Sequence, residues 1–142
     1  MIAIRELTKA SPKALEDINA LVYQLSERLP KCSMELLTKI VADKNVELWV
    51  AQDDETIVGM ATLAVVVIPE GERAQIEDVV VDGKYRCQGL GKQLSEKLIA
   101  RARERKIGSI SLSSRTDREA ANKLYQKLGF EQWPTNVYRL KL

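Results

Sequence analysis

The amino-acid sequence predicts an α/β protein built around a mixed central sheet. Three observations indicate this class. Short segments that alternate apolar and polar residues, or that are rich in β-branched residues, predict strands. Longer segments with apolar residues three and four positions apart predict helices. The two kinds follow one another in the order strand, two helices, three strands, helix, strand, helix, strand, which is typical of α/β proteins.

The first strand is predicted around Ile2 and Ile4, where apolar and charged residues alternate. A helix should begin at Ser11-Pro12, because a serine side chain can accept a hydrogen bond from a free first-turn amide and proline suits the first turn. The apolar face of this helix consists of Leu15, Ile18, Val22 and Leu25. The helix should end near Leu29-Pro30, and a second helix should begin at Ser33.

Three strands are predicted in the middle of the chain. The segment Glu47–Gln52 alternates, and the acidic turn Asp53–Glu55 leads into Thr56–Ile68, which is rich in β-branched residues. These two segments should form a hairpin. Pro69–Glu72 makes the next turn, and Ala74–Asp82 makes the third strand of this group.

A third helix follows, because leucine recurs at every fourth position and alanine continues the row. The row consists of Leu90, Leu94, Leu98 and Ala102. The helix should run to about Lys106, with Gly108 closing it. A short strand is then expected at Ile110 and Leu112.

The last predicted helix begins at Asp117 or Arg118 and ends at Gly129, a residue type that favours helix ends. The remainder, residues 130–142, is predicted to form one or two final strands.

Composition limits the classes of function. The 142 residues carry 22 Lys plus Arg against 20 Asp plus Glu, and a net charge of +2 gives no reason to expect a nucleic-acid or membrane partner. No apolar run approaches the roughly 20 residues that a membrane helix needs, and the N-terminus does not resemble a secretion signal. We therefore expect a single domain over residues 1–142, located in the cytoplasm.

The sequence contains no histidine and has two cysteines far apart, Cys32 and Cys87. The absence of histidine removes the commonest general base and most catalytic zinc sites. Two cysteines without metal-ligand spacing are expected to be free thiols, so no metal site is predicted. The chemistry must therefore use carboxylates, tyrosine, lysine, backbone amides or a cofactor.

Two glycines stand at the start of the third helix. Glycine costs about 1 kcal/mol relative to alanine inside a helix, so Gly89 and Gly91 need a reason. Without side chains there, the backbone can approach an anion, and the first-turn amides lie at the positive end of the helix dipole. Lys84, Arg86 and Lys92 add positive charge at the same end. A pyrophosphate is the ligand that this pattern favours.

Two other phosphate motifs match poorly. A Walker A loop needs Gly-Lys followed by Ser or Thr, and here Gln93 follows Gly91-Lys92. A dinucleotide fingerprint needs a third glycine or alanine where this chain has Leu94.

The pattern Arg86-x-x-Gly89-x-Gly91, between a predicted strand and a leucine-spaced helix, resembles the coenzyme motif of the GNAT superfamily of acyl-CoA-dependent N-acetyltransferases. The segment from Arg118 to Phe130 resembles a second motif of that superfamily. The resemblance covers essentially the whole chain and is strongest from Ala74 to Phe130. It implies a mostly antiparallel sheet that splays into a V-shaped cleft flanked by helices. Acetyl-CoA, as co-substrate, would lie between the strand ending at Val81 and the strand near Leu112.

The resemblance also implies which residues bind the coenzyme. The strand backbone would pair with the pantetheine arm and the acetyl carbonyl, the amides of the helix start would hold the pyrophosphate, and Asn122 would reach the pantetheine. The implied set is Val79, Val80, Val81, Arg86, Cys87, Gln88, Gly89, Leu90, Gly91, Lys92, Asn122 and Tyr125.

Two side chains are expected to transfer protons. The resemblance places Tyr125 beside the coenzyme sulfur, and a phenol with a pKa of about 10 can protonate a departing thiolate at neutral pH; the alternative is a core aromatic on the apolar face of the last helix. Glu77 is the expected base, acting through water, and the alternative is a solvated carboxylate. Asp78 faces the other way in a regular strand, and a β-bulge would change which carboxylate points into the cleft.

The predicted function is direct transfer of an acetyl group to a primary amine of a small molecule or peptide. The resemblance implies that residues 23–38 and 132–138 build the acceptor side. Glu27, Glu35 and Glu47 are candidates to attract a cationic amine, with ordinary surface charge as the alternative.

Three other functions stay open. One is an amino-sugar acetyltransferase of the glucosamine-6-phosphate type, in which Arg115 and Arg118 would bind the phosphate. The second is a non-catalytic acyl-CoA-binding regulatory domain, and the third is a nucleotide-binding α/β module. A homodimer is compatible with the GNAT resemblance.

Overall fold

The computed structural model of the protein describes residues 1–142 and has a five-stranded sheet at its centre. The strand order is β1-β2-β3-β4-β5; neighbours from β1 to β4 are antiparallel, and β4 and β5 are parallel. The strands are β1 Ile2–Glu6, β2 Val46–Asp53, β3 Thr56–Ile68, β4 Gly71–Val81 and β5 Ile110–Ser111. The predicted α/β class and the mixed, mostly antiparallel sheet are confirmed.

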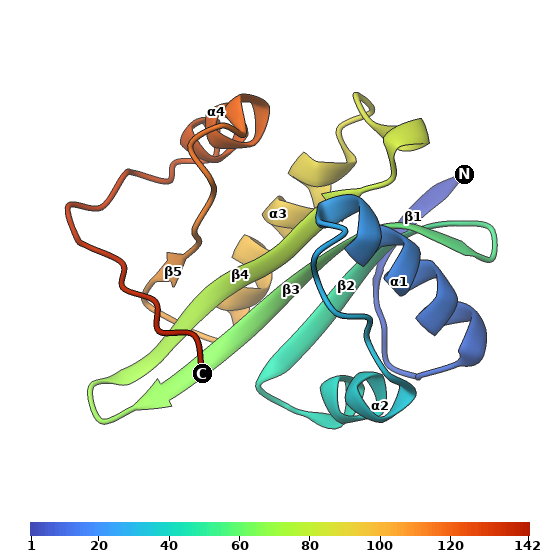
Figure 1. Ribbon diagram of the computed structural model, residues 1–142. Helices are drawn as coiled ribbons and strands as arrows, with labels where there is room; N and C mark the ends of the chain where they lie inside the picture. The colour runs from blue at the N-terminus through green and yellow to red at the C-terminus, as the bar shows by residue number, and fades with distance from the viewer.

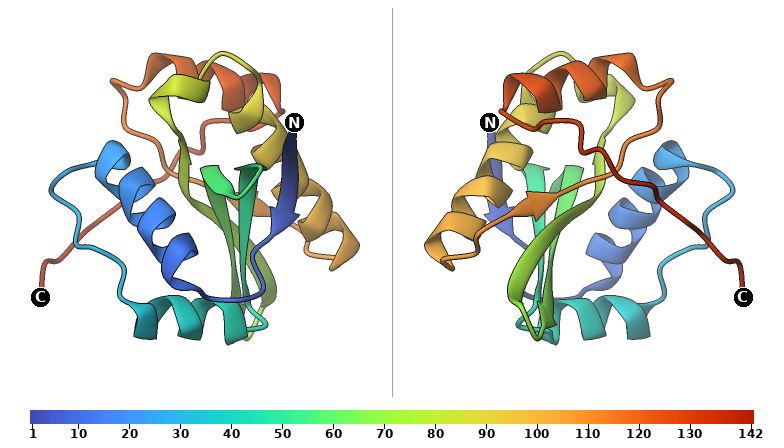
Figure 2. Two further views of the ribbon diagram at one scale, coloured as in Figure 1. Left: turned by 90° about the vertical axis from the view of Figure 1, so that its right-hand side faces the viewer. Right: turned by 90° about the vertical axis from the view of Figure 1, so that its left-hand side faces the viewer.

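Helices cover both faces of the sheet. They are α1 Pro12–Leu25, α2 Met34–Ala42, α3 Leu90–Glu104 and α4 Glu119–Lys127. Figures 1 and 2 show α1 and α2 on one face and α3 on the other, and one hydrophobic core lies in each layer. In contrast, α4 lies at one end of the sheet and makes few backbone contacts with the other helices and strands, although its Tyr125 is buried. None of these helices has the length and apolarity to cross a membrane.

The predicted helix starts are confirmed by their caps. Ser11 Oγ accepts the Ala14 amide at 3.1 Å, and Ser33 Oγ accepts the Leu36 amide at 3.0 Å. The predicted apolar row on α3 is also confirmed, because all four of its members are buried. They are Leu90, Leu94, Leu98 and Ala102.

Two helix ends differ from the prediction. The chain leaves α1 at Ser26, which is extended (φ −165°, ψ 126°), rather than near Leu29-Pro30. The C-cap of α3 is Arg105, and the next residue, Lys106, takes the left-handed conformation (φ 59°). The helix therefore ends before Gly108, the residue predicted to close it. Gly129, with φ of 100°, ends α4 as predicted.

The sheet splays between β4 and β5. These strands pair only at Ala74 with Ile110 and at Gln75 with Ser111. Beyond Gln75, β4 continues to Val81 with no strand on its β5 side, and Figure 1 shows the two chain segments diverging. This opening is the V-shaped cleft that the GNAT resemblance implies, and it leaves backbone groups of β4 unpaired along one edge.

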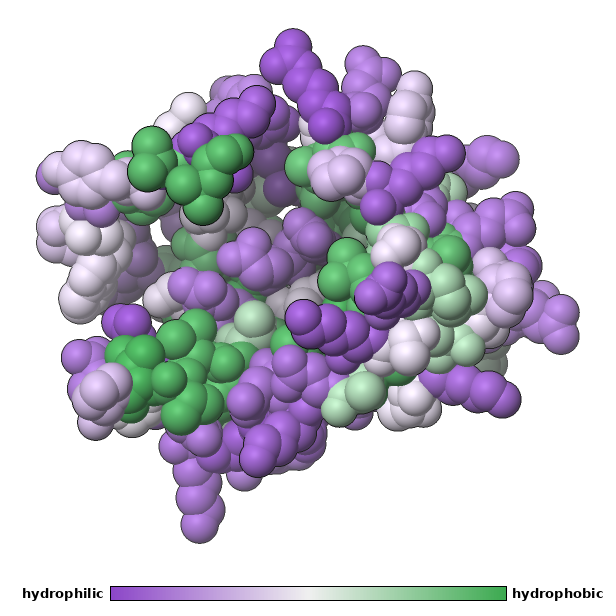
Figure 3. All heavy atoms as spheres, turned by 60° about the horizontal axis from the view of Figure 1, so that its bottom comes forward, coloured by the Kyte–Doolittle hydropathy of each residue, from purple (hydrophilic) through white to green (hydrophobic).

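The final strands predicted for residues 130–142 are absent. The segment pairs with no strand, and its backbone makes one internal hydrogen bond, from the Thr135 amide to the Trp133 carbonyl at 2.9 Å. Strand-favouring residues form strands when they can pack on a pleated, half-buried surface. Here Trp133 and Val137 are 75% and 84% exposed. In Figure 3, apolar groups on the face shown form separate patches between hydrophilic side chains.

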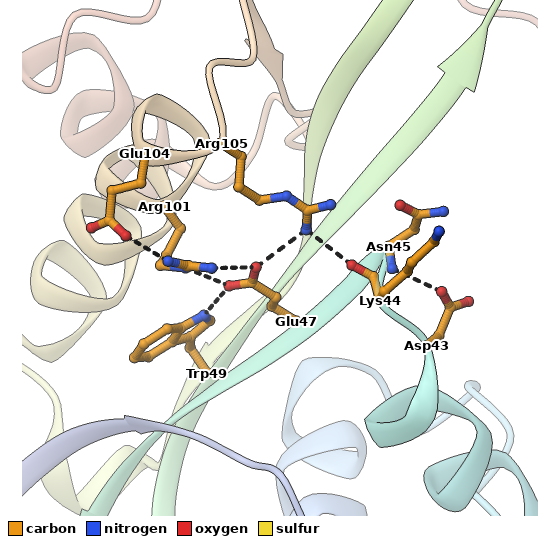
Figure 4. Close-up of polar contacts among 8 residues, drawn as sticks. All are labelled: Asp43, Lys44, Asn45, Glu47, Trp49, Arg101, Glu104 and Arg105. Carbon is orange, nitrogen blue, oxygen red and sulfur yellow. Dashed lines mark hydrogen bonds and ion pairs between the residues drawn. The ribbon is translucent and has the colours of Figure 1, made fainter.

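A buried carboxylate joins β2 to α3. Glu47, only 5% exposed, accepts hydrogen bonds from Arg101 Nε at 2.8 Å, Arg105 at 3.2 Å and Trp49 Nε1 at 2.9 Å (Figure 4). Burial would raise the pKa of Glu47, but the hydrogen bonds from Arg101, Trp49 and Arg105 outweigh it and hold the pKa below its usual 4.5. Both sequence-based interpretations of Glu47, attraction of an amine substrate and ordinary surface charge, are therefore wrong, since the carboxylate is buried and its charge is used inside the fold.

Candidate active site

The start of α3 presents a row of unused hydrogen-bond donors. No backbone amide from Arg86 to Lys92 donates to an acceptor within the chain. Cys87 (φ 64°) and Gly89 (φ 79°) take left-handed conformations within this row, and successive amides in such a turn make a concave anion site. The first-turn amides also lie at the positive end of the α3 dipole. This segment thus has the donors that an anionic group requires.

The two glycines of this row have different structural reasons. Gly89 precedes α3 in a left-handed conformation that residues with a side chain adopt at a cost. Gly91 is helical, and a Cβ there would sit 3.9 Å from side-chain atoms of Leu124 and Val81, which is ordinary contact. The packing of the chain therefore does not explain Gly91, whereas close approach of a ligand would.

Hydrogen bonds anchor the loop that precedes this row. Asp82 Oδ1 accepts the Lys84 amide at 2.8 Å, and Gln24 Oε1 accepts the Gly83 amide at 2.9 Å. The Lys84 amide, with a smaller contribution from Gln24, lowers the pKa of Asp82. The Tyr85 hydroxyl donates to Asp53 Oδ2 at 2.7 Å. The donor row therefore starts from a fixed point at the end of β4.

Some residues predicted to bind the coenzyme can offer only backbone atoms to it, whereas others have exposed side chains. Leu90 and Val80 have side chains in the two hydrophobic cores, so only their backbone can face a ligand. Val79 and Val81 are half-buried, and the Val81 carbonyl accepts a hydrogen bond from Arg86 Nε at 3.3 Å. The members with exposed side chains are Arg86, Cys87, Gln88 and Lys92.

A cavity of about 470 Å³ lies between the end of α1, β4, the segment after β5, and α4. Three residues predicted to act near the acyl group line it, namely Glu77, Asp78 and Tyr125. The structure therefore brings together the carboxylates of β4 and the tyrosine of α4, which are distant in the sequence. A smaller cavity of about 260 Å³, beside the β1–α1 loop, contains none of the predicted site residues.

A β-bulge in β4 explains how both carboxylates reach the cavity. Met60 pairs with Val80 and Thr62 pairs with Glu77, so the single residue between them on β3 faces two residues on β4. One of the two is Asp78, whose φ is 51°. The bulge that was considered for this strand is thus present, and consecutive side chains no longer alternate strictly across the sheet.

The cavity raises the pKa of both carboxyl groups. Partial desolvation raises the pKa of Glu77, and the negative charge of Asp78 raises it further. Desolvation alone raises the pKa of Asp78. Each carboxylate is therefore a better proton acceptor than an isolated one, while both side chains stay open to solvent.

Tyr125 is 7% exposed and stacks edge-on against Phe130, with ring centroids 5.9 Å apart. It is thus both a core aromatic and a wall of the cavity. Burial raises the pKa of Tyr125, and the nearby charge of Arg118 opposes that shift. The phenol consequently holds its proton through the neutral pH range.

Asn122 fixes the loop between β5 and α4. Its Nδ2 donates to the carbonyl oxygens of Arg115, at 2.9 Å, and Arg118, at 2.8 Å. These bonds occupy the side-chain nitrogen, and Oδ1 is the atom left for a ligand. Asn122 therefore holds one wall of the cavity in position.

The segments predicted to build the acceptor side reach the cavity only in part. Leu25, Ser26 and Leu29 line the cavity, whereas Glu27 and Glu35 do not. No residue from 132–138 lines it, but Arg139, the next residue, does.

The run Ser113-Ser114-Arg115 also lines the cavity, and only its arginine was anticipated from the sequence. Polar residues directly after a short apolar strand are the signal that could have identified the two serines.

Comparison with known proteins agrees with this geometry. A family model described as "Acetyltransferase (GNAT) family" matches residues 12–130. The chain belongs to the GNAT family. In this member of the GNAT family, the splayed sheet is combined with a donor row at the start of α3 and a cavity at the bulge of β4.

A curated relative of this GNAT chain is GCN5-related N-acetyltransferase 2, chloroplastic, of Arabidopsis thaliana. The two are 40% identical over 86 residues, which is 61% of this chain and 31% of the relative. The chain thus spans about a third of the length of that protein.

Solved structures match over the whole GNAT chain. An acetyltransferase of Trypanosoma brucei gives a TM-score of 0.81 at 29% identity, with 100% of each chain covered. A predicted acetyltransferase of Clostridium acetobutylicum, solved with acetyl-CoA, gives a TM-score of 0.80 at 18% identity, covering 99% of this chain and 96% of that one. At that identity, the second match shows a shared fold alone.

Proposed function

We propose that the protein transfers the acetyl group of acetyl-CoA directly to a primary amine. One observation carries this proposal: the unused amides from Arg86 to Lys92 and the open edge of β4 lead to a cavity lined by Glu77 and Tyr125. Membership of the GNAT family supports the reaction class. The C. acetobutylicum acetyltransferase, which has the same fold, was solved with acetyl-CoA, so this fold can accommodate that coenzyme.

The coenzyme diphosphate would bind the amides of residues 86–92. The backbone N–H groups in this row are free to donate to phosphate oxygens, because none has a partner to leave. Lys84, Arg86 and Lys92 lie on the same end of α3 and add favourable charge. The thioester arm would then follow the unpaired edge of β4 toward the bulge.

Glu77 is the proposed base, with Asp78 beside it. The incoming amine must lose a proton to become nucleophilic, and a carboxylate with a raised pKa accepts it more readily at neutral pH. When the amine nitrogen attacks the acetyl carbon, negative charge develops on the carbonyl oxygen. A backbone donor near Val81, on the open edge of β4, would stabilise that charge.

Tyr125 is the proposed acid. As the bond between acetyl carbon and sulfur breaks, the departing thiolate needs a proton, and the buried phenol carries one. The overall balance is one amide formed and one thioester broken, with two protons lost by the ammonium nitrogen: Glu77 passes one to solvent, and the other replaces the proton that Tyr125 gives to the thiolate. The exposed Cys87 thiol has no part in this direct transfer.

The proposal is tested by thiol release and calorimetry. Purified protein is titrated with acetyl-CoA, then assayed for free CoA thiol with a panel of amino acids, amino sugars, polyamines, aminoglycosides and peptides. We expect measurable binding heat and amine-dependent thiol release. Binding without release for any amine would favour the non-catalytic acyl-CoA-binding role, and absence of binding to folded protein would contradict the proposal.

A further inference from the structure

Three arginines converge on the cavity from two distant parts of the chain. Arg115 and Arg118 come from the loop between β5 and α4, and Arg139 comes from the C-terminal segment. On the β4 side of the same cavity lie Glu77 and Asp78. The cavity is therefore dipolar, with a cationic wall and an anionic wall.

The cationic wall is not neutralised by the protein. Arg118 and Arg139 take part in no ion pair within the chain. Arg115 meets only Asp117, at 3.8 Å, with both side chains mostly exposed. Exposed pairs of this kind contribute little. The guanidinium groups are thus available to a ligand.

A second observation in this wall also points to a ligand. The Ser114 hydroxyl is buried and has no hydrogen-bond partner, and Ser114 lines the cavity between the loop arginines and β5. Buried polar side chains nearly always have a partner. An oxygen-rich group bound by the arginines would supply one once the Ser114 side chain turns toward the cavity.

The wall is also held in place before any ligand binds. The two hydrogen bonds from Asn122 fix the backbone of Arg115 and Arg118. Arg118 lies close enough to Tyr125 for its charge to act on the phenol. An anion at Arg118 would therefore lie near the proposed site of transfer.

We propose that the acceptor is a primary amine that also carries an oxyanion, either a carboxylate or a phosphate. The inference rests on the proposed N-acetyltransferase function. Arg118, with Arg115 and Arg139, binds the oxyanion, and the amine end lies at Glu77 and Asp78. A guanidinium matches the geometry of both oxyanions with paired hydrogen bonds, and a dipolar acceptor would complement both walls of the cavity.

The test compares acceptors that differ only in the anionic group. One pair is glucosamine 6-phosphate and glucosamine, and the other is L-alanine and L-alaninamide. Because a hydrogen bond to a charged group contributes more than one to a neutral group, we expect kcat/KM to be about 10- to 100-fold higher for the anionic member of at least one pair. The pair that responds identifies the oxyanion as phosphate or carboxylate.

Variants connect the preference to the cationic wall. Arg118→Gln and Arg139→Gln, alone and combined, should lower the ratio of kcat/KM between anionic and neutral acceptors toward one. Arg73→Gln is the matched control, because Arg73 is an exposed arginine in β4 close to the β3–β4 turn, paired with Glu70 at 3.7 Å. The control should keep the wild-type ratio.

Several results would overturn the inference. Acetylation confined to amines without an anionic group would do so, as would a ratio that survives in the double variant. If Arg118→Gln raised the dissociation constant of acetyl-CoA by the same factor by which it lowered kcat/KM for the anionic acceptor, this arginine would belong to the coenzyme site. Absence of both acetyl-CoA binding and thiol release would instead overturn the proposed function itself, and the inference with it.

Discussion

Glu77 and Asp78 are consecutive residues of one β-strand, yet both line the same cavity. The bulge in β4 makes this possible, because the left-handed Asp78 breaks the alternation of side chains. The negative charge of Asp78 also contributes to the raised pKa of Glu77. Glu77 therefore titrates under the influence of Asp78.

This coupling gives a pH prediction. A raised pKa means that Glu77 gains its proton at a higher pH than an isolated carboxyl, so kcat/KM should fall on the acidic side above the usual value of 4.5. Asp78→Asn removes the repelling charge and should move this acidic fall in kcat/KM, the acidic limb of the pH profile, to lower pH. Asparagine tolerates the left-handed conformation, so the fold should be kept.

The second variant for the same question is Glu77→Gln, which should remove the acidic limb and lower kcat. Both variants are measured with one amine, so that the titration of the substrate is constant. An acidic limb that stays unchanged in Glu77→Gln would argue against this residue as the base.

Removal of the Tyr125 hydroxyl should affect turnover and leave coenzyme binding nearly intact. We expect Tyr125→Phe to lower kcat by about 100-fold or more, since general acids contribute on that scale. The ring keeps its contact with Phe130, so stability should change little. Tyr23→Phe serves as the control, because that exposed tyrosine donates to Glu27 and does not line the cavity.

Replacing Gly91 with alanine should change protein stability and coenzyme binding in opposite directions. Gly91→Ala meets only ordinary contacts and should stabilise α3 by about 0.5–1 kcal/mol. The same methyl would stand before the unused amides and should weaken acetyl-CoA binding about 10-fold or more. Denaturant melts and calorimetry give the two quantities.

The control for this experiment is Gly108→Ala. A Cβ at Gly108 has nothing within 4 Å, and the residue is far from the donor row in sequence. Unaltered affinity in both variants would remove the start of α3 from the coenzyme site.

The buried Glu47 should contribute strongly to stability. Glu47→Gln leaves two guanidinium groups without their carboxylate, and we expect a loss of about 2–4 kcal/mol in the free energy of unfolding. Glu104→Gln, which removes an exposed partner of the same Arg101, should cost less than about 1 kcal/mol.

The contribution of Glu47 should also depend on pH. Its pKa is lower in the folded state than the usual 4.5, so the stabilisation is fully present above that value and is lost as the pH falls through the folded pKa. Urea unfolding at neutral pH and in acid should show the difference between wild type and Glu47→Gln shrinking in acid. A difference that is constant with pH would contradict this account.

The features of the fold that were predicted correctly from the sequence have local causes. Ser11 and Ser33 cap the helices that follow them, and the leucine row of α3 is buried at every position. The glycine pair at the start of α3 predicted the donor row, because two glycines at a helix start can be recognised from the sequence alone.

The parts that sequence missed depend on contacts between distant segments. Residues 130–142 have strand-favouring side chains but no strand beside them, and Glu47 gains its role from two arginines of α3. Arg139 reaches the cavity only through the path of the C-terminal segment. Local patterns do not contain this information.

The narrow junction between β4 and β5 bears on the kinetic order of the reaction. The wall of the cleft that carries Tyr125 and Arg118 is fixed internally by the Asn122 hydrogen bonds, but its strand joins the sheet through only two residue pairs. A long ligand that touches both α3 and α4 would brace this wall. We therefore expect compulsory-order addition, in which the thioester enters first, the amine follows, and free CoA departs last.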